Sequence, residues 1–194
     1  MKVKKVIVIL IVLIFILNIS KCYASTDNLD ISAESAILID SSSERVLYSK
    51  NENEKMYPAS TTKIPSGYSV AALQTGEQLT VEQLLKLMMV HSANDAANVL
   101  AFHVSGSISS FANLMNQKVA DLGLTNTHFT NPSGMHDENH YTTAHDLAIL
   151  MKYCMKNSTF RSLAGLKSCT IPATNKYEER IFKTTNDLLI YDNR

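Results

Sequence analysis

Two short apolar segments, separated by a polar turn, stand near the start of the chain. Residues 36–40 read Ala-Ile-Leu-Ile-Asp, residues 45–49 read Arg-Val-Leu-Tyr-Ser, and Ser-Ser-Ser-Glu joins them. Short β-favouring segments with such a turn between them predict a β-hairpin. Residues 169–190 are also extended in character, so we expect strands at the other end of the chain.

Four segments between these strands have the apolar spacing of helices. The first begins near Val81, because Thr80 and Gln83 have the spacing of a capping box. Gly123 is placed to end the third, and Thr143 to cap the fourth. The apolar positions are Leu84, Leu85, Leu87 and Met88 in the first segment, several residues within 95–104 in the second, Phe111, Leu114, Met115 and Leu122 in the third, and Leu147, Leu150, Met151 and Cys154 in the fourth.

Strands at both ends with helices between them predict an α/β (α+β) sandwich. In this arrangement the N-terminal and C-terminal strands share one sheet, and the helices cover it. The sequence contains no internal repeat. We therefore expect one domain of ordinary size.

The N-terminus has the layout of a secretory signal peptide. Three lysines precede an unbroken run of twelve apolar residues, 6–17, which is too short to cross a bilayer. Small residues place cleavage after Ala24, so we expect a signal peptide over 1–24 and an exported domain over 25–194. Lipidation at Cys22 is the weaker alternative, because Lys21 fits a lipobox poorly. An uncleaved segment would instead leave the chain at the membrane surface.

Charge and composition exclude several classes of protein. The full chain has 18 basic and 18 acidic residues, and removal of 1–24 leaves 14 and 18, a net charge of −4. This is not the balance of a basic nucleic-acid-binding protein. A hydrophobic content of 45% with only six glycines also excludes disordered and collagen-like chains.

Export makes Cys154 and Cys169 candidates for a disulfide. The alternative is a buried free thiol, which we favour because Cys154 falls on a predicted apolar stripe. Neither the number nor the spacing of cysteines suggests a metal site. A group of imidazoles and carboxylates also fits no zinc spacing: His136, Asp137, Glu138, His140 and His145.

Ser60 and Lys63 form the sequence S-x-x-K. On a helix, side chains three residues apart lie on one face, so the amine of Lys63 could take the proton of the Ser60 hydroxyl. Such a base requires a pKa lowered by burial or by a neighbouring positive charge. A chance S-x-x-K is common in a chain of this length, so the motif alone is weak.

Ser92-Ala93-Asn94 adds a hydroxyl and an amide between two predicted helices. Ser92 could relay a proton toward a leaving amine, and Asn94 could hold a substrate amide. The alternative is a purely structural role as a helix cap, with Asn94 or Asp95 capping the following helix. Both interpretations can hold together.

Several segments together resemble the low-molecular-weight penicillin-binding proteins, specifically the D-alanyl-D-alanine carboxypeptidases. They occur in the family's order and the likeness covers most of residues 36–190. The segments are residues 36–49, Tyr-Pro-Ala-Ser-Thr-Thr-Lys-Ile at 57–64, Ser-Ala-Asn-Asp-Ala-Ala at 92–97 and Asn-Pro-Ser-Gly at 131–134.

The resemblance implies a serine acyl-transfer enzyme with the penicillin-binding protein/β-lactamase-like transpeptidase fold. Ser60 would be the acylated nucleophile, Lys63 its general base, Ser92 the proton relay and Asn94 a substrate-positioning group. The substrate would be a peptidoglycan stem peptide ending in D-Ala-D-Ala, on the outer face of the membrane or in the cell wall. β-Lactams would acylate the same serine, and no metal or other cofactor is expected.

The chain departs from the family's pattern in two places. None of its six glycines has Lys or His two positions before it, so the family's third motif, K-T-G, is absent. Lys183-Thr184-Thr185 lacks the glycine and resembles the segment that precedes that motif. In addition, Pro65 and Gly67 follow Lys63 closely, where the family has a longer helix.

These departures predict a truncated domain that lacks its last sheet strands and has an internal deletion after Lys63. They leave two alternatives to a carboxypeptidase. One is a non-catalytic remnant or peptidoglycan-binding fragment. The other is a β-lactamase-like hydrolase, for which the sequence offers no obvious carboxylate to activate water.

Overall fold

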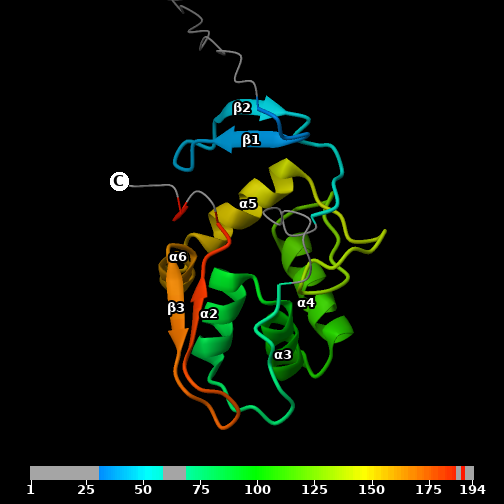
Figure 1. Ribbon diagram of the computed structural model, residues 1–194. Helices are drawn as coiled ribbons and strands as arrows, with labels where there is room; N and C mark the ends of the chain where they lie inside the picture. The colour runs from blue at the N-terminus through cyan, green and yellow to red at the C-terminus, as the bar shows by residue number, and fades with distance from the viewer. Residues whose placement is uncertain (1–30, 59–68, 187–188, 191–194) are drawn as a thin grey trace, which may run out of the picture. The chain divides into compact units, whose positions relative to one another are not determined.

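The computed structural model describes residues 31–58, 69–186 and 189–190. All described helices and strands lie in one compact unit, Ala33–Arg194. The proposed nucleophile Ser60 and its base Lys63 fall outside the described residues, as does the expected signal peptide. Figure 1 shows the elements, which run in the order β1, β2, α2, α3, α4, α5, α6, β3 and β4.

Strands β1 (Ala36–Ile39) and β2 (Val46–Lys50) form the expected antiparallel hairpin. Asp40 holds the turn, because its Oδ1 accepts hydrogen bonds from the backbone N–H groups of Ser42 and Ser43, at 3.1 and 2.7 Å, and from both hydroxyls. These donors favour the ionised carboxylate and hold the pKa of Asp40 well below its usual range. The Ser-rich turn therefore has a defined, hydrogen-bonded conformation.

Helices α2 (Val81–His91) and α3 (Asn94–Ser105) carry the main core. Thr80 and Gln83 form the predicted capping box, in which each side chain bonds the other residue's backbone N–H. Leu87 and Val90 of α2 are almost completely buried. They pack with Ala96 and Leu100 of α3 and with Ile171. The predicted spacing of apolar residues is therefore the spacing of the core.

Helices α4 (Ile108–Asp121) and α5 (Ala144–Cys154) confirm the other two predicted helices. Gly123 follows α4 with φ +74°, a left-handed conformation that favours glycine. The Thr143 hydroxyl accepts a hydrogen bond from the Asp146 N–H at 3.1 Å, which caps α5 as expected. A second small core joins these helices around Val119, Leu124 and Phe129.

Helix α6 (Ser158–Ala164) was not predicted. Asn157 caps it by accepting a hydrogen bond from the Phe160 N–H. With seven residues the helix has less than two turns, so it contains too few apolar positions to show a period.

Strands β3 (Ser168–Ile171) and β4 (Arg180–Lys183) form a second antiparallel hairpin beside α2 (Figure 1). The prediction of strands within 169–190 is confirmed. The expectation that the N-terminal and C-terminal strands share one sheet is wrong for the described residues, since β1 pairs with β2 and β3 pairs with β4. Each strand pairs with its neighbour in sequence, while Cys169 and Ile171 of β3 belong to the main core.

The loop between α4 and α5 is held by a buried polar group. The Asp146 carboxylate accepts hydrogen bonds from the Thr127 hydroxyl at 2.8 Å and from the Asn126 N–H at 3.1 Å. Nearby, the side chain of His140 is buried, and its Nδ1 accepts a hydrogen bond from the Thr130 N–H at 3.1 Å. This bond requires Nδ1 to be unprotonated.

Stability is expected to fall between pH 7 and pH 5 through His140. Burial is the main factor that lowers the pKa of His140 below its ordinary value. The folded protein keeps this imidazole neutral while the unfolded chain takes up a proton, so acid favours unfolding. Urea unfolding at pH 7 and pH 5 measures the free energy of unfolding, which should decrease less in His140→Asn than in the wild type. In the matched control, His103→Asn at an exposed position, the free energy of unfolding should decrease as much as in the wild type.

No helix in the described ranges is both long enough and apolar enough to span a membrane.

Candidate functional site

The Ser92-Ala93-Asn94 motif forms the link between α2 and α3. Ser92 follows the last residue of α2 in a left-handed conformation, with φ 54° and ψ 34°, and its N–H donates to the carbonyl of Leu87. Ala93 is buried in the core, and Asn94 is the first residue of α3. The hydroxyl and the amide of the motif therefore lie at one helix junction, and both residues are half-buried.

The helix-cap interpretation of this motif needs correction. The N-cap residue of α3 is Ala93, which makes no side-chain capping bond, so neither Asn94 nor Asp95 occupies that position. The left-handed Ser92 reverses the chain so tightly that α3 begins one residue earlier than a polar cap would require. Asp95 still serves the helix start, because its Oδ1 accepts a hydrogen bond from the Ala96 N–H.

Residues 69–73 lie against the start of α3. The Ser69 hydroxyl donates to the carbonyl of His91 at 2.5 Å, and the Ser69 carbonyl accepts from the Asn94 N–H at 2.9 Å. The Asp95 carboxylate accepts hydrogen bonds from the N–H groups of Ala71 at 2.9 Å and Leu73 at 3.0 Å. The chain that follows the proposed nucleophile motif is thus attached to both ends of the Ser-Ala-Asn link.

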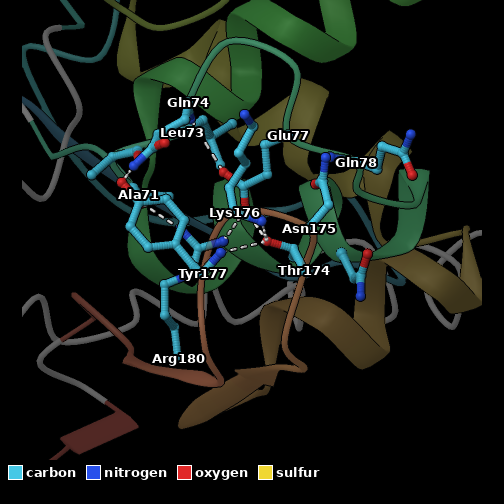
Figure 2. A network of polar contacts seen from close by, with 12 residues as sticks. Ala71, Leu73, Gln74, Glu77, Gln78, Thr174, Asn175, Lys176, Tyr177 and Arg180 are labelled. Atoms are coloured by element: carbon cyan, nitrogen blue, oxygen red, sulfur yellow. Dashed lines mark hydrogen bonds and ion pairs between the residues drawn. The ribbon is translucent and has the colours of Figure 1, made fainter.

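A second set of polar contacts joins residues 71–72 to the β3–β4 hairpin. Figure 2 shows Arg180 of β4 directed toward Glu77, and the two side chains form an ion pair. Arg180 also donates to the carbonyl of Ala71 at 3.2 Å, and its guanidinium lies 4.2 Å from the ring centre of Tyr177. The Tyr177 hydroxyl donates to the carbonyl of Ala72, which has a left-handed φ of 55°. We call Glu77, Tyr177 and Arg180 the arginine clamp.

The β3–β4 hairpin reaches the Ser-Ala-Asn link directly through Thr185. The Thr185 N–H donates to the carbonyl of Val90 at 3.1 Å, and its hydroxyl lies 3.1 Å from the Ser92 hydroxyl. The structure therefore brings together Ser92 and Asn94, both predicted as site residues, with Ser69, Asp95 and Thr185, which were not. The Lys183-Thr184-Thr185 sequence gave no signal of this contact, because 93 residues separate Thr185 from Ser92.

An apolar cavity of about 600 Å³ opens between α2, the end of α5 and α6, and its lining does not include the Ser-Ala-Asn link. Its wall includes Met88, Phe160 and the half-buried Cys154. Both Cys154 and Cys169 carry free thiols. Burial raises the pKa of each thiol, which disfavours the reactive thiolate.

The imidazoles and carboxylates of residues 136–145 do not converge on a point. His136 contacts the Tyr57 ring, His140 bonds the backbone of Thr130, and His145 lies 3.4 Å from Asp146. Within the part of the chain that the structure describes, no three His, Cys, Asp or Glu residues are grouped to hold a metal ion.

Comparison with known sequences identifies the relatives of this chain. The sequence pattern of the D-alanyl-D-alanine carboxypeptidase family matches residues 22–71 and 65–194. The two matches meet at the stretch after Lys63, where the sequence departs from the family's pattern. A carboxypeptidase of Bacillus subtilis, DacF, is 36% identical over an alignment of 168 positions, which covers 72% of this chain and 43% of the relative. One from Mycobacterium tuberculosis, DacB2, is 30% identical over 81% of this chain and 62% of the relative.

Solved structures of related enzymes have a similar fold. A variant of a Streptomyces DD-transpeptidase matches with a TM-score of 0.75 at 27% identity, covering 84% of this chain and 78% of that one. A D-alanyl-D-alanine carboxypeptidase from Mycobacterium tuberculosis matches with a TM-score of 0.73 at 28% identity, covering 83% and 69%. The predicted penicillin-binding protein fold is confirmed. The chain spans less than half of its Bacillus relative, and it belongs to the D-alanyl-D-alanine carboxypeptidase family.

Proposed function

We propose that this chain is a serine-type D-Ala-D-Ala carboxypeptidase, which removes the terminal D-Ala of peptidoglycan stem peptides through an acyl-enzyme on Ser60. The observation that carries the proposal is the Ser92-Ala93-Asn94 link. Ser69, Asp95 and Thr185 each make two hydrogen bonds that hold this link or its flanking residues, six in all. A link built only to join two helices requires no such set of contacts from distant parts of the chain.

The reaction uses the motif residues in two stages. Ser60 Oγ attacks the carbonyl carbon of the penultimate D-Ala and gives its proton to the amine of Lys63. The C–N bond then breaks, and the proton passes from Lys63 through the Ser92 hydroxyl to the nitrogen of the leaving D-Ala. Water attacks the ester carbonyl and releases the shortened peptide and free Ser60. The backbone N–H of Ser60 supplies half of the oxyanion hole.

Asn94 positions the substrate in this scheme. Its backbone N–H is occupied by the carbonyl of Ser69, which fixes the residue at the start of α3. A side-chain amide offers one acceptor and two donors, the groups that pair with a peptide bond. We place the reaction outside the cytoplasm, at the cell wall or the membrane surface, because the substrate is found there and the N-terminus has the layout of a signal peptide.

The main competing function is that of a non-catalytic, peptidoglycan-binding fragment. The observation that favours it is the absence of K-T-G from residues 1–194, since that motif supplies the cation that meets the substrate carboxylate. Formation of a covalent bond to Ser60 separates the two functions, because a fragment that only binds has no activated nucleophile.

The test is intact mass spectrometry of the purified chain after incubation with benzylpenicillin. Attack on the β-lactam carbonyl opens the ring without losing a fragment, so the expected adduct adds the mass of the whole penicillin. Trypsin cleavage after Lys55 and Lys63 should place the added mass on peptide 56–63, which contains Ser60. A folded chain with no adduct would overturn the proposal. Rapid penicillin hydrolysis without a persistent adduct would favour the β-lactamase-like alternative.

A further inference from the structure

The backbone of Ser92 is fixed, whereas its hydroxyl needs a partner to fix its direction. The left-handed φ of 54° and the N–H bond to Leu87 determine where the Cα–Cβ bond of Ser92 points. A serine hydroxyl still rotates among several orientations, with one donor and two acceptor positions. A relay that must deliver its proton to one nitrogen requires that this rotation be restricted.

Thr185 is built to provide this restriction. Its N–H donates to the Val90 carbonyl, one of the carbonyls that the end of α2 leaves unpaired. The preceding residue, Thr184, is buried, and its N–H donates to the carbonyl of Lys167 at 2.9 Å. A β-branched side chain has few rotamers, so this anchored backbone presents the Thr185 hydroxyl to Ser92 in a defined direction.

We propose that Thr185 is a positioning residue that aligns the Ser92 hydroxyl for proton transfer. The proposal rests on the proposed function. The two oxygen atoms lie 3.1 Å apart, and either hydroxyl can be the donor. In the aligned state the Thr185 hydroxyl donates to one lone pair of Ser92 Oγ. The Ser92 proton is then left to point toward the leaving nitrogen. The same bond stabilises Ser92 Oγ while it gives up that proton and takes another from the Lys63 ammonium.

The direct test is the rate of acylation by a fluorescent penicillin. Thr185→Val keeps the shape of the side chain and removes the hydroxyl. We expect a loss of about fivefold to tenfold in the limiting acylation rate, the effect of one hydrogen bond, with little change in the concentration that gives half of that rate. Thr185→Ser restores the hydroxyl and should restore most of the rate.

Two further variants separate positioning from a general structural effect. Thr184→Val removes a buried hydroxyl whose hydrogen bond comes from the Asn186 N–H and not from Ser92. It should lower the unfolding temperature and leave the limiting acylation rate near that of the wild type. In a Ser92→Ala background, Thr185→Val should cause no further loss, because Thr185 acts through Ser92.

Each outcome has a definite meaning. If Thr185→Val is acylated as fast as the wild type, or if its loss persists in full in the Ser92→Ala background, the positioning role is wrong while the proposed function stands. If the folded wild-type chain forms no adduct, the proposed function fails and the positioning role fails with it.

Discussion

Ser60→Ala is expected to abolish the penicillin adduct completely, whereas Thr61→Ala should retain it. The reason is chemical, since a covalent ester requires the hydroxyl oxygen and alanine has none. Thr61 is the matched control because it offers another hydroxyl in the same tryptic peptide. Intact mass spectrometry after a fixed incubation measures both. An adduct on Ser60→Ala would show that penicillin modifies a different residue.

Lys63→Met should keep Ser60 but remove its base. A positioned general base contributes roughly 10²–10⁴-fold to such a step, so we expect an acylation rate lowered by about this factor. Lys63→Arg should be equally slow, because a guanidinium stays protonated and cannot accept the serine proton. If Lys63→Arg is acylated at the wild-type rate, Lys63 contributes only charge and another group is the base.

Local signals explain why most elements could be predicted. Thr80, Thr143 and Gly123 mark helix ends through contacts within four residues of themselves, and these contacts form as the sequence predicts. Sheet pairing has no such local mark. The sequences of β3 and β4 indicate extended chain, but they do not specify whether the partner is β1 or each other, and the shared sheet was therefore predicted wrongly.

The candidate site likewise contains some residues that could be predicted from the sequence and others that could not. Ser92 and Asn94 could be predicted because the S-x-N pattern contains both, two residues apart. Ser69 contacts Asn94 from 25 positions away (94 − 69 = 25), and Thr185 contacts Ser92 from 93 positions away. Single serines and threonines carry no sequence signal for such contacts. The groups that we propose act on a substrate could thus be predicted from the sequence, whereas the groups that hold them required the fold.

Arg180→Met is expected to lower the free energy of unfolding by about 3–5 kcal/mol, the cost of leaving a buried charge without its partner. The Glu77 side chain is only 1% exposed. After the substitution its carboxylate would keep, among partners in the described part of the chain, the Thr174 hydroxyl at 3.1 Å and the Gln74 N–H at 3.2 Å. Urea unfolding at pH 7, followed by circular dichroism, measures the change.

The matched control is the pair formed by Lys86 and Glu82, 2.7 Å apart on α2. Glu82 is 73% exposed, so Lys86→Met should cost less than about 1 kcal/mol. Adding Glu77→Leu to Arg180→Met should recover part of the loss, because the unpaired charge is then gone. Equal costs for Lys86→Met and Arg180→Met would show that the arginine clamp contributes no more than a surface pair.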